Sequence, residues 1–555
     1  MKKKYVRWTL WTIASPFILF IILCILIYLP PIQNFLVDKA AVYASEATGM
    51  NISVGRISLS FPLNLVVTNV DAASPHNDTL LSVRRLQVNV QLLPLLKKQV
   101  EVDGISLQGA TVNSNDLIHG MKLNGTLGEL FISSHGVALD PETAIVNKVL
   151  LKDTDLSLCL NDTAAADTAA SDTAYWKIIL QDIDLQNVSF ALDMPLDSLS
   201  LAASLDNAIL RDGLIDLHKS AYSLQTFRIE NGRVRYDNGK PLAADSLSSG
   251  LDPSHIALTD IGVKLDSLYY GGRNMKAIIS QFVLKERSGV EIVSATGRMV
   301  SNDKVLRVPS LKLETRDSYL ELNAAMDWNA LDFKDEGLVS ARLMADIGKP
   351  DVVRFMGSMD EKFIRQYPSE PLRIRTGIDG DLNKLKLTTL TAELPGALGL
   401  FARGELTHLT DSLLRGGDIT LEAETKDLKF VSTLAEGIEI PYGTRLEGKF
   451  TMAGTKMGTD LLLMQPEAQA VVAADTIPIT VYNDSISVAD DFKMERAARL
   501  FAKYDLSRDR YEADLAVNHF DLHQFMPADS LYTLSTRLKV EGEGFDFFSP
   551  RTYFN

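Results

Sequence analysis

Hydrophobic and polar residues alternate with a period of two along most of the chain after residue 50. In residues 86–92, for example, the apolar positions are separated by Gln87, Asn89 and Gln91. The same alternation returns in residues 372–378, 385–387, 419–425, 511–517 and 538–540. Because successive side chains of a strand point to opposite faces, this pattern predicts strands with one apolar face and one wet face. We therefore predict a mainly β fold.

Four segments share a longer pattern, which indicates an internal repeat. The first is defined by Val102, Ile105, Leu107, Ala110 and Val112, and equivalent positions recur in residues 146–156, 180–190 and 224–234. The segments start 44, 34 and 44 residues apart. This spacing is typical of a stacked unit of a few strands that buries its apolar face against its neighbours. The repeat favours one elongated sheet over separate globular domains.

Two segments interrupt the alternation. Residues 161–173 contain only Asn, Asp, Thr, Ala and Ser, which predicts a flexible loop because nothing large is available for burial. Residues 350–367 have apolar side chains at helical spacing, which predicts one amphipathic helix packed on the sheet. Those side chains are Val352, Phe355, Met356, Met359 and Phe363.

The N-terminal 30 residues have the features of a membrane anchor. Residues 8–29 contain no formal charge and would span roughly 33 Å as a helix, about the thickness of a bilayer core. Lys2, Lys3, Lys4 and Arg7 precede them, so the positive-inside rule predicts a cytoplasmic N-terminus and a body on the other side of the membrane. The alternative is a cleaved signal peptide, which shares the basic start and apolar core. The expected anchor residues are Trp8, Trp11, Phe17, Leu19, Phe20, Leu23, Leu26, Tyr28 and Leu29.

A short amphipathic helix is predicted directly after the anchor. Apolar residues recur at helical spacing from Ile32 to Ala47, and Gly49 is a suitable C-terminal cap. This helix either lies on the outer surface of the membrane or plugs the first layer of the β body. Plugging is favoured because the polar face of the helix is not basic.

Charge and motif content argue against nucleic-acid binding and catalysis. The chain has 71 acidic and 56 basic residues, a formal charge of −15, and no basic stripe with interleaved aromatic residues. Common nucleophile, nucleotide and zinc motifs are absent, and Cys24 and Cys159 are too differently placed to pair. The sharpest metal candidate is His519, Asp521 and His523, but a plain polar strand face is favoured because two imidazoles and one carboxylate arise easily at this spacing. We predict no enzyme activity, no cofactor and no metal.

Several stretches together resemble the AsmA-like family, and within it the TamB branch of Bacteroidetes-type bacteria. They are PPIQNFLVDKAAVYASEATGMNISVGRISLSFPLNLVV after the anchor, then LLSVRRLQVNVQLLPLLKKQVEVDGISLQGATVN, and later LDPSHIALTDI, IDGDLNKLKLTTLTAELPG and FMPADSLYTLSTRLKVEGEGFDFFSPRT. The resemblance covers nearly the whole chain, but its motifs are patterns of hydrophobicity and turns. TamB-like chains normally continue to a further C-terminal domain, so we expect either a truncated longer protein or a short AsmA-like one.

The resemblance implies an elongated, twisted β-sheet groove of the bridge-like lipid-transfer kind. It implies an inner-membrane protein with its body in the periplasm, phospholipid as cargo and links to the outer-membrane assembly machinery. On this basis the chain divides into the basic start and transmembrane helix (1–30), the amphipathic helix (31–49), a β-groove (50–349), the helix (350–367) and the continuing β-groove (368–555). The residues expected to line the groove are Leu86, Val88, Val90, Leu92, Leu385 and Leu387.

Two functions remain open at this point. In the first, the apolar strand faces line a conduit that shields acyl chains between the inner and outer membranes, at about 0.8 kcal/mol for each buried methylene. In the second, the groove is filled by its own side chains, and the protein is an envelope scaffold or assembly factor for outer-membrane proteins that acts through edge-strand contacts. An open apolar surface would favour the conduit, and a filled core would favour the scaffold.

Overall fold

The structure is a computed structural model that describes the greater part of the chain. The described residues are 39, 41–42, 45, 50–60, 64–74, 79–90, 102–114, 121–138, 142–161, 176–239, 250–334, 336–356, 360–434, 437–466, 496–528, 530–544 and 553–554. Strands contain 71% of them and helices 8%. The prediction of a mainly β fold is confirmed.

The predicted N-terminal elements lie mostly outside these residues. All the anchor residues of the predicted transmembrane segment are outside them, and of the loop predicted at 161–173 only Asn161 is described. In the described part of the chain, no helix has both the length and the apolar character needed to cross a membrane. Of the amphipathic helix predicted at 31–49, the four described residues are helical. One of them, Ser45, accepts a hydrogen bond at Oγ from the backbone N–H of Ile52, at 3.0 Å.

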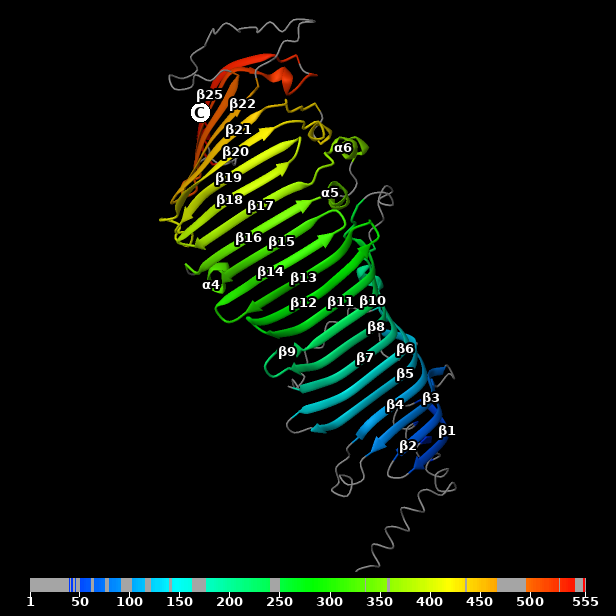
Figure 1. Ribbon diagram of the computed structural model, residues 1–555. Coiled ribbons are helices and arrows are strands. Elements are labelled where there is room, and N and C mark those ends of the chain that lie inside the picture. Colours follow the sequence, from blue (N-terminus) through cyan, green and yellow to red (C-terminus); the bar gives the residue numbers. More distant parts are fainter. Residues whose placement is uncertain are drawn as a thin grey trace, which may run out of the picture. The chain divides into compact units, whose positions relative to one another are not determined.

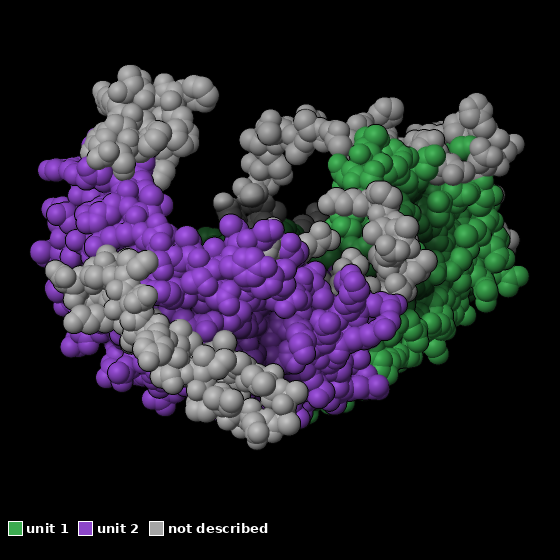
Figure 2. Space-filling view, turned by 90° about the horizontal axis from the view of Figure 1, so that it is seen from above, with its two compact units in different colours: residues 1–242, 252–272, 279–287 green, residues 243–251, 273–278, 288–555 purple. Residues whose placement is uncertain are grey.

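The chain divides into two compact units, which Figure 2 draws in different colours. Unit 1 contains residues 1–242, 252–272 and 279–287, and unit 2 contains residues 243–251, 273–278 and 288–555. The division falls within the stretch 50–349 that the sequence grouped as one β region. One strand, β12 (Asn274–Glu286), contributes residues to both units.

Unit 1 is a sheet of long strands (Figure 1). Its elements are β1 (Asn51–Ser60), β2 (Asn64–Ala73), β3 (Thr79–Val90), β4 (Val102–Asn113), β5 (Met121–Ala138), β6 (Thr143–Leu160), β7 (Lys177–Met194), η1 (Pro195–Asp197), β8 (Leu199–Asp216), β9 (Ala221–Leu224), β10 (Thr226–Asp237) and β11 (His255–Gly271). Consecutive strands from β1 through β6 pair antiparallel. By contrast, β6 and β7 pair in parallel. Antiparallel pairing then continues through β7, β8, β10 and β11, with β9 between β8 and β11.

Unit 2 is an antiparallel sheet in which neighbours in sequence are neighbours in space. Its strands are β13 (Glu291–Ser301), β14 (Val305–Thr315), β15 (Tyr319–Asp327), β16 (Leu338–Ile347), β17 (Leu372–Asp381), β18 (Lys384–Leu394), β19 (Leu398–Thr407), β20 (Gly416–Thr425), β21 (Arg445–Ala453), β22 (Lys456–Met464), β23 (Ala497–Asp505), β24 (Arg510–Asp521), β25 (Thr533–Glu543) and β26 (Tyr553–Phe554). From β13 onward each pairs with the next. Such local pairing needs only short connections.

Short helices lie at the ends of the strands of unit 2. They are α4 (Trp328–Leu331), α5 (Lys349–Met356), α6 (Glu361–Gln366), η2 (Val431–Thr433) and η3 (Leu522–Gln524). Figure 1 shows α4 at one end of the strands and α5 and α6 at the other.

The single helix predicted at 350–367 is corrected, because the structure has two helices there, α5 and α6. Asp360 precedes α6 with an extended ψ of 139°, and its side chain accepts a hydrogen bond from the backbone N–H of Lys362. An Asp in this position caps the start of a new helix and favours non-helical backbone at the cap itself. The apolar spacing continued across this boundary and so concealed it.

A filled hydrophobic core occurs at the strand ends beneath α6. Phe363 of α6 is 1% exposed and packs against Tyr367 and Phe430, with ring centroids 5.6 and 5.7 Å away. Leu394, Ala397 and Leu428 complete the buried cluster. Side chains in this closed interior of unit 2 are almost fully buried. The exposed fractions of side chains on the sheet faces can be compared with them.

An uncovered apolar face as the candidate functional site

Strand pairing in unit 1 aligns apolar side chains into rows that run across the strands. Residues opposite each other in a β ladder lie on the same face of the sheet. The first row consists of Ile57, Val67, Leu86, Leu107, Leu130, Leu151, Leu185, Ala208, Ile229 and Val263. The second row consists of Leu65, Val88, Ile105, Ile132, Val149, Ile183, Leu210, Phe227 and Leu265. An apolar surface therefore continues without interruption from β2 to β11.

The side chains of these rows are only half-buried. Ala208, at 4% exposed, is the one buried member of the two rows, and the others keep intermediate exposure. A second layer packed on this face would remove such side chains from water, as happens to Phe363 beneath α6. The described residues therefore place no closed layer over this face of unit 1.

A third and a fourth row extend the apolar face toward the other end of the strands. The third row consists of Val54, Val70, Val83, Ala110, Leu127, Thr154, Val188 and Leu205. The fourth consists of Ile52, Ala72, Leu81, Val112, Gly125, Leu156, Phe190, Ala203, Val234 and Leu258. Phe190 is 38% exposed, which is unusual for a phenylalanine on the apolar side of a sheet.

Between the first and third rows, the strands from β1 to β8 and β10 each have two residues where plain alternation has one. In β2, β4, β6, β7 and β10, the chain runs from the first row toward the third. In these strands the second of the two residues takes a left-handed backbone conformation. These residues are Asn69, Gly109, Asp153, Asn187 and Asn231, with φ of 53°, 62°, 48°, 51° and 53°; we call them the seam. Asn, Asp and Gly adopt this conformation at the least steric cost. An extra residue in a strand bends that strand. When neighbouring strands bend at aligned positions, the sheet bends along a line that crosses them.

The seam accounts for the internal repeat. The first three repeated segments each supply one residue to each of the four rows; in β7 these are Ile183, Leu185, Val188 and Phe190. The fourth segment supplies residues to the first, second and fourth rows. The step of three between Leu185 and Val188 is where the seam residue lies. Segments 146–156 and 180–190 are paired directly, with Val146 opposite Leu180 and Leu156 opposite Phe190.

Unit 2 has rows of the same kind. One row consists of Leu311, Leu322, Leu343, Thr376, Leu390, Ala402, Leu421, Gly448, Leu461, Leu500, Leu515 and Leu538. We call it the leucine row. Apart from Ala402 and Gly448, which are buried, its members are half-buried or exposed. The leucine row thus lacks a closed covering within the described residues of unit 2.

Of the residues predicted to line the groove, two fall into the rows of unit 1. Leu86 and Val88 belong to the first and second rows of unit 1, and Val90 lies opposite Val102 of β4. Leu92 lies outside the described residues.

In unit 2, Leu387 lies between Ile378 and Gly404, and Leu385 lies between Gly380 and Leu406. Both leucines are half-buried, whereas the intervening Lys386 is exposed.

The opposite face of each sheet carries cross-strand ion pairs, and in unit 1 it also carries apolar side chains such as Phe131, Leu150 and Ile209. In unit 1, Arg211 bonds Asp184 at 2.8 Å and also pairs with Asp182. In unit 2, Arg499 donates two hydrogen bonds to Asp460, at 2.8 and 2.6 Å. The hydrogen bond from Arg499, reinforced by its charge, lowers the pKa of Asp460 although partial burial opposes the shift. These ion pairs therefore lie on the face opposite the apolar rows.

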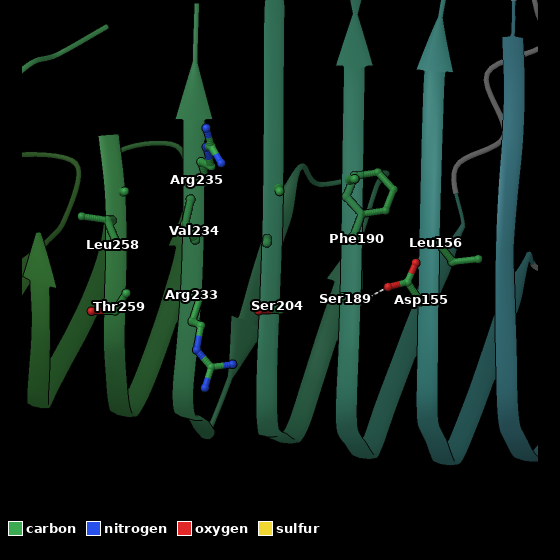
Figure 3. Close-up of a pocket in the computed structure, with 14 residues that line it drawn as sticks. Asp155, Leu156, Ser189, Phe190, Ser204, Arg233, Val234, Arg235, Leu258 and Thr259 are labelled. Carbon is green, nitrogen blue, oxygen red and sulfur yellow. Dashed lines mark hydrogen bonds between the residues drawn. The ribbon is translucent and has the colours of Figure 1, made fainter. Parts of the chain in front are cut away.

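A hollow of about 370 Å³ crosses β6, β7, β8, β10 and β11 in unit 1 (Figure 3). Its lining consists of fourth-row members and of the residues on both sides of them, such as Ser189 and Ala191 around Phe190. The fourth-row members are Leu156, Phe190, Ala203, Val234 and Leu258. Alternation places these flanking side chains on the polar face. The hollow therefore lies at the level of the fourth row, and its lining combines members of that row with the small and polar residues beside them.

The histidine pair considered for metal binding does not converge. His519 contacts Asn518 through Nδ1 at 2.9 Å, and the ring of His523 stacks on Tyr532 at 4.8 Å. Asp521 instead accepts a hydrogen bond from the backbone N–H of His523 at the start of η3. Among the described residues, no three His, Cys, Asp or Glu side chains are grouped as metal ligands would be.

Sequence reasoning identified the apolar rows but missed the seam. Its signal is readable in the repeat, because Gly109, Asp153, Asn187 and Asn231 each directly precede the fourth position of a repeated segment. A scan against protein-family models and a search of curated proteins both find no match to this chain. The geometry of the apolar face therefore carries the functional argument.

Proposed function

We propose that this protein is a membrane-anchored, AsmA-like envelope protein that carries phospholipid acyl chains along its apolar sheet face between the inner and outer membranes. The observation that carries this proposal is the continuity of half-buried apolar rows from β2 to β11. The charge-free segment 8–29 would hold the chain in the inner membrane with its body in the periplasm.

The energetics support a conduit that needs no catalysis. Each methylene removed from water contributes about 0.8 kcal/mol, so an acyl chain crossing an aqueous compartment strongly favours an apolar surface. Half-buried rows such as the first row of unit 1 offer that surface. Since neighbouring rows repeat at each strand, a chain sliding along the sheet would exchange one set of contacts for a similar set.

The experiment is to purify the full chain and identify bound lipid by mass spectrometry. Wild-type protein should carry phospholipid. Phe190→Asp should reduce it, because a carboxylate then lies in the fourth apolar row between Leu156 and Ala203. The matched control is Ala191→Asp, one residue along on the polar face, which should leave the lipid content unchanged. Wild-type protein free of lipid would overturn the proposal.

The alternative is an envelope scaffold or assembly factor for outer-membrane proteins. One observation favours it, namely the filled aromatic core formed by Phe363, Tyr367 and Phe430 at the strand ends of unit 2. A core of this kind stabilises a fixed surface rather than a passage. In this case an affinity-purified full chain would bring down outer-membrane assembly proteins, and Phe190→Asp would leave that association intact.

A further inference from the structure

We propose that the seam sets the cross-section of the apolar face in unit 1, and that Asp153 and Asn187 are its positioning residues. The inference rests on the proposed function for its cargo, but the geometric part stands on the backbone alone. Figure 3 shows neighbouring strands turning sharply at one level, just beyond Asp155, Ser189 and Arg233. The seam residues of these three strands lie two residues before those positions.

The seam is held on two of these strands by a side-chain contact. Asn187 of β7 donates from Nδ2 to Oδ1 of Asp153 on β6, at 2.9 Å. On the next pair of strands, Asn231 of β10 bonds Asp206 of β8. Each contact joins the bend of one strand to that of its neighbour, so the strands bend at a common level.

Backbone conformation, rather than the amide group, is the general requirement of the seam. In β4 the seam residue is Gly109, which adopts a φ of 62° without a side chain. Next to it on β5 lies Gly128, where an added Cβ would come within 2.8 Å of Asp153 Cβ. Glycine therefore occupies the position of the bend in both β4 and β5. A β-branched residue would disfavour the left-handed conformation there.

We place a second bend on the other side of the first and second rows. Asn147 of β6 donates from Nδ2 to Oε1 of Gln181 on β7, at 2.9 Å, and Asp212 of β8 has a φ of 51°. In β6 the residues between the two bends, 148–152, carry one member each of the first and second rows. They span roughly 16 Å at about 3.3 Å per residue. This strip is the floor of a trough whose walls are the strand segments beyond the bends.

If the strands were straight at the seam, the segments beyond it would no longer flank the first and second rows. Acyl chains bound on those rows would then be more exposed to water. The test uses the full chain with Cys24 and Cys159 replaced by serine. Spin labels at Lys177→Cys and Asp193→Cys, both exposed positions on β7, report the end-to-end length of the strand. Sixteen straight residue steps would span about 53 Å, and a bent strand is shorter.

The double variant Asp153→Val/Asn187→Val should lengthen the distance between the labels. Binding of a fluorophore-labelled palmitic acid should weaken by about tenfold, the effect of exposing roughly two methylenes. Asp153→Gly/Asn187→Gly should retain both the distance and the binding, because glycine adopts the left-handed conformation freely. If the valine variant does not fold, Asn187→Ala provides a milder version of the same change.

The outcomes separate this inference from the proposed function. An unchanged distance in the valine or alanine variant would overturn the role of the seam. A longer distance with unchanged palmitate binding would overturn its role in positioning cargo. If wild-type protein binds no palmitate while the distances respond as expected, the proposed function fails and the seam still shapes the sheet.

Discussion

Asn187 on β7 and Asp153 on β6 occupy equivalent positions of two repeated segments and bond to each other across the parallel strand pair. The Asn187 Nδ2 to Asp153 Oδ1 distance is 2.9 Å, and both residues have left-handed backbone. The repeat in the sequence is thereby expressed as a direct contact. The same contact marks the level at which the strands bend.

Replacing Asn187 should therefore destabilise unit 1 through its backbone. Asn187→Val should lower the free energy of unfolding by about 1–2 kcal/mol, the usual penalty for a side chain that disfavours left-handed backbone, with the lost hydrogen bond adding about 1 kcal/mol. Asn187→Gly should lose only the hydrogen bond. Denaturant unfolding measures both, and equal losses in the two variants would contradict a conformational role.

A charge on the leucine side of β18 distinguishes an open face from a filled core in unit 2. Leu387 is half-buried between Ile378 and Gly404. Leu387→Asp should leave the melting temperature nearly unchanged, because the carboxylate stays hydrated on an uncovered face. In a filled core, the same change would destabilise by several kcal/mol, of order 3 or more, through burial of an unpaired charge.

The control for that experiment is Lys386→Gln on the wet face. A glutamine avoids the repulsion that an aspartate would meet from Asp379 and Glu405, the residues opposite Lys386. Thermal unfolding of both variants is compared with wild type. Collapse of the fold in Leu387→Asp alone would support the scaffold alternative.

The aromatic core beneath α6 should behave as a true interior. Phe363→Ala should cost about 3–5 kcal/mol, the range for removing a buried phenylalanine. Phe355 on α5 is 58% exposed, so Phe355→Ala should change stability by less than about 0.5 kcal/mol. Similar losses in the two variants would mean that α5 packs more closely than the structure indicates.

Acid should weaken the ion pair between Arg499 and Asp460. The pKa of Asp460 in the folded chain is below its ordinary value of 3.8. The pair therefore contributes stability above that value, and the contribution is lost as the pH falls through the lower, folded pKa. Asp460→Asn should remove this part of the acid dependence, which unfolding curves measured from neutral pH to below pH 3.8 would reveal. Parallel curves for the variant and wild type would exclude the linkage.

Alternation in the sequence was sufficient to predict the strands. Residues 372–378 and 385–387 fall within β17 and β18, because apolar side chains on every second residue serve one face of a sheet. The same rule placed Leu86, Val88, Leu385 and Leu387 on the apolar side of their strands; that they line a groove stays a prediction. Side-chain periodicity shows directly which face of a sheet a residue lies on. This part of the prediction therefore did not require knowing which strands pair with each other.

The pairing of strands and the break between two helices were harder to predict from the sequence. The parallel pairing of β6 with β7 depends on backbone hydrogen bonds, which leave no mark on side-chain periodicity. The division into α5 and α6 depends on the cap at Asp360, which apolar spacing does not detect. The seam had a local signal in its Asn, Asp and Gly residues, and it became interpretable once the rows were known.

If the protein is a lipid conduit, acyl chains contact its apolar face and avoid the polar one. A photoreactive phenylalanine analogue placed at Phe190, and separately at Ala191, tests this in the full chain within its own membranes. Mass spectrometry then identifies what each position captures on irradiation. We expect phospholipid adducts at position 190 and none at position 191. Equal capture at both positions, or capture at neither, would contradict it.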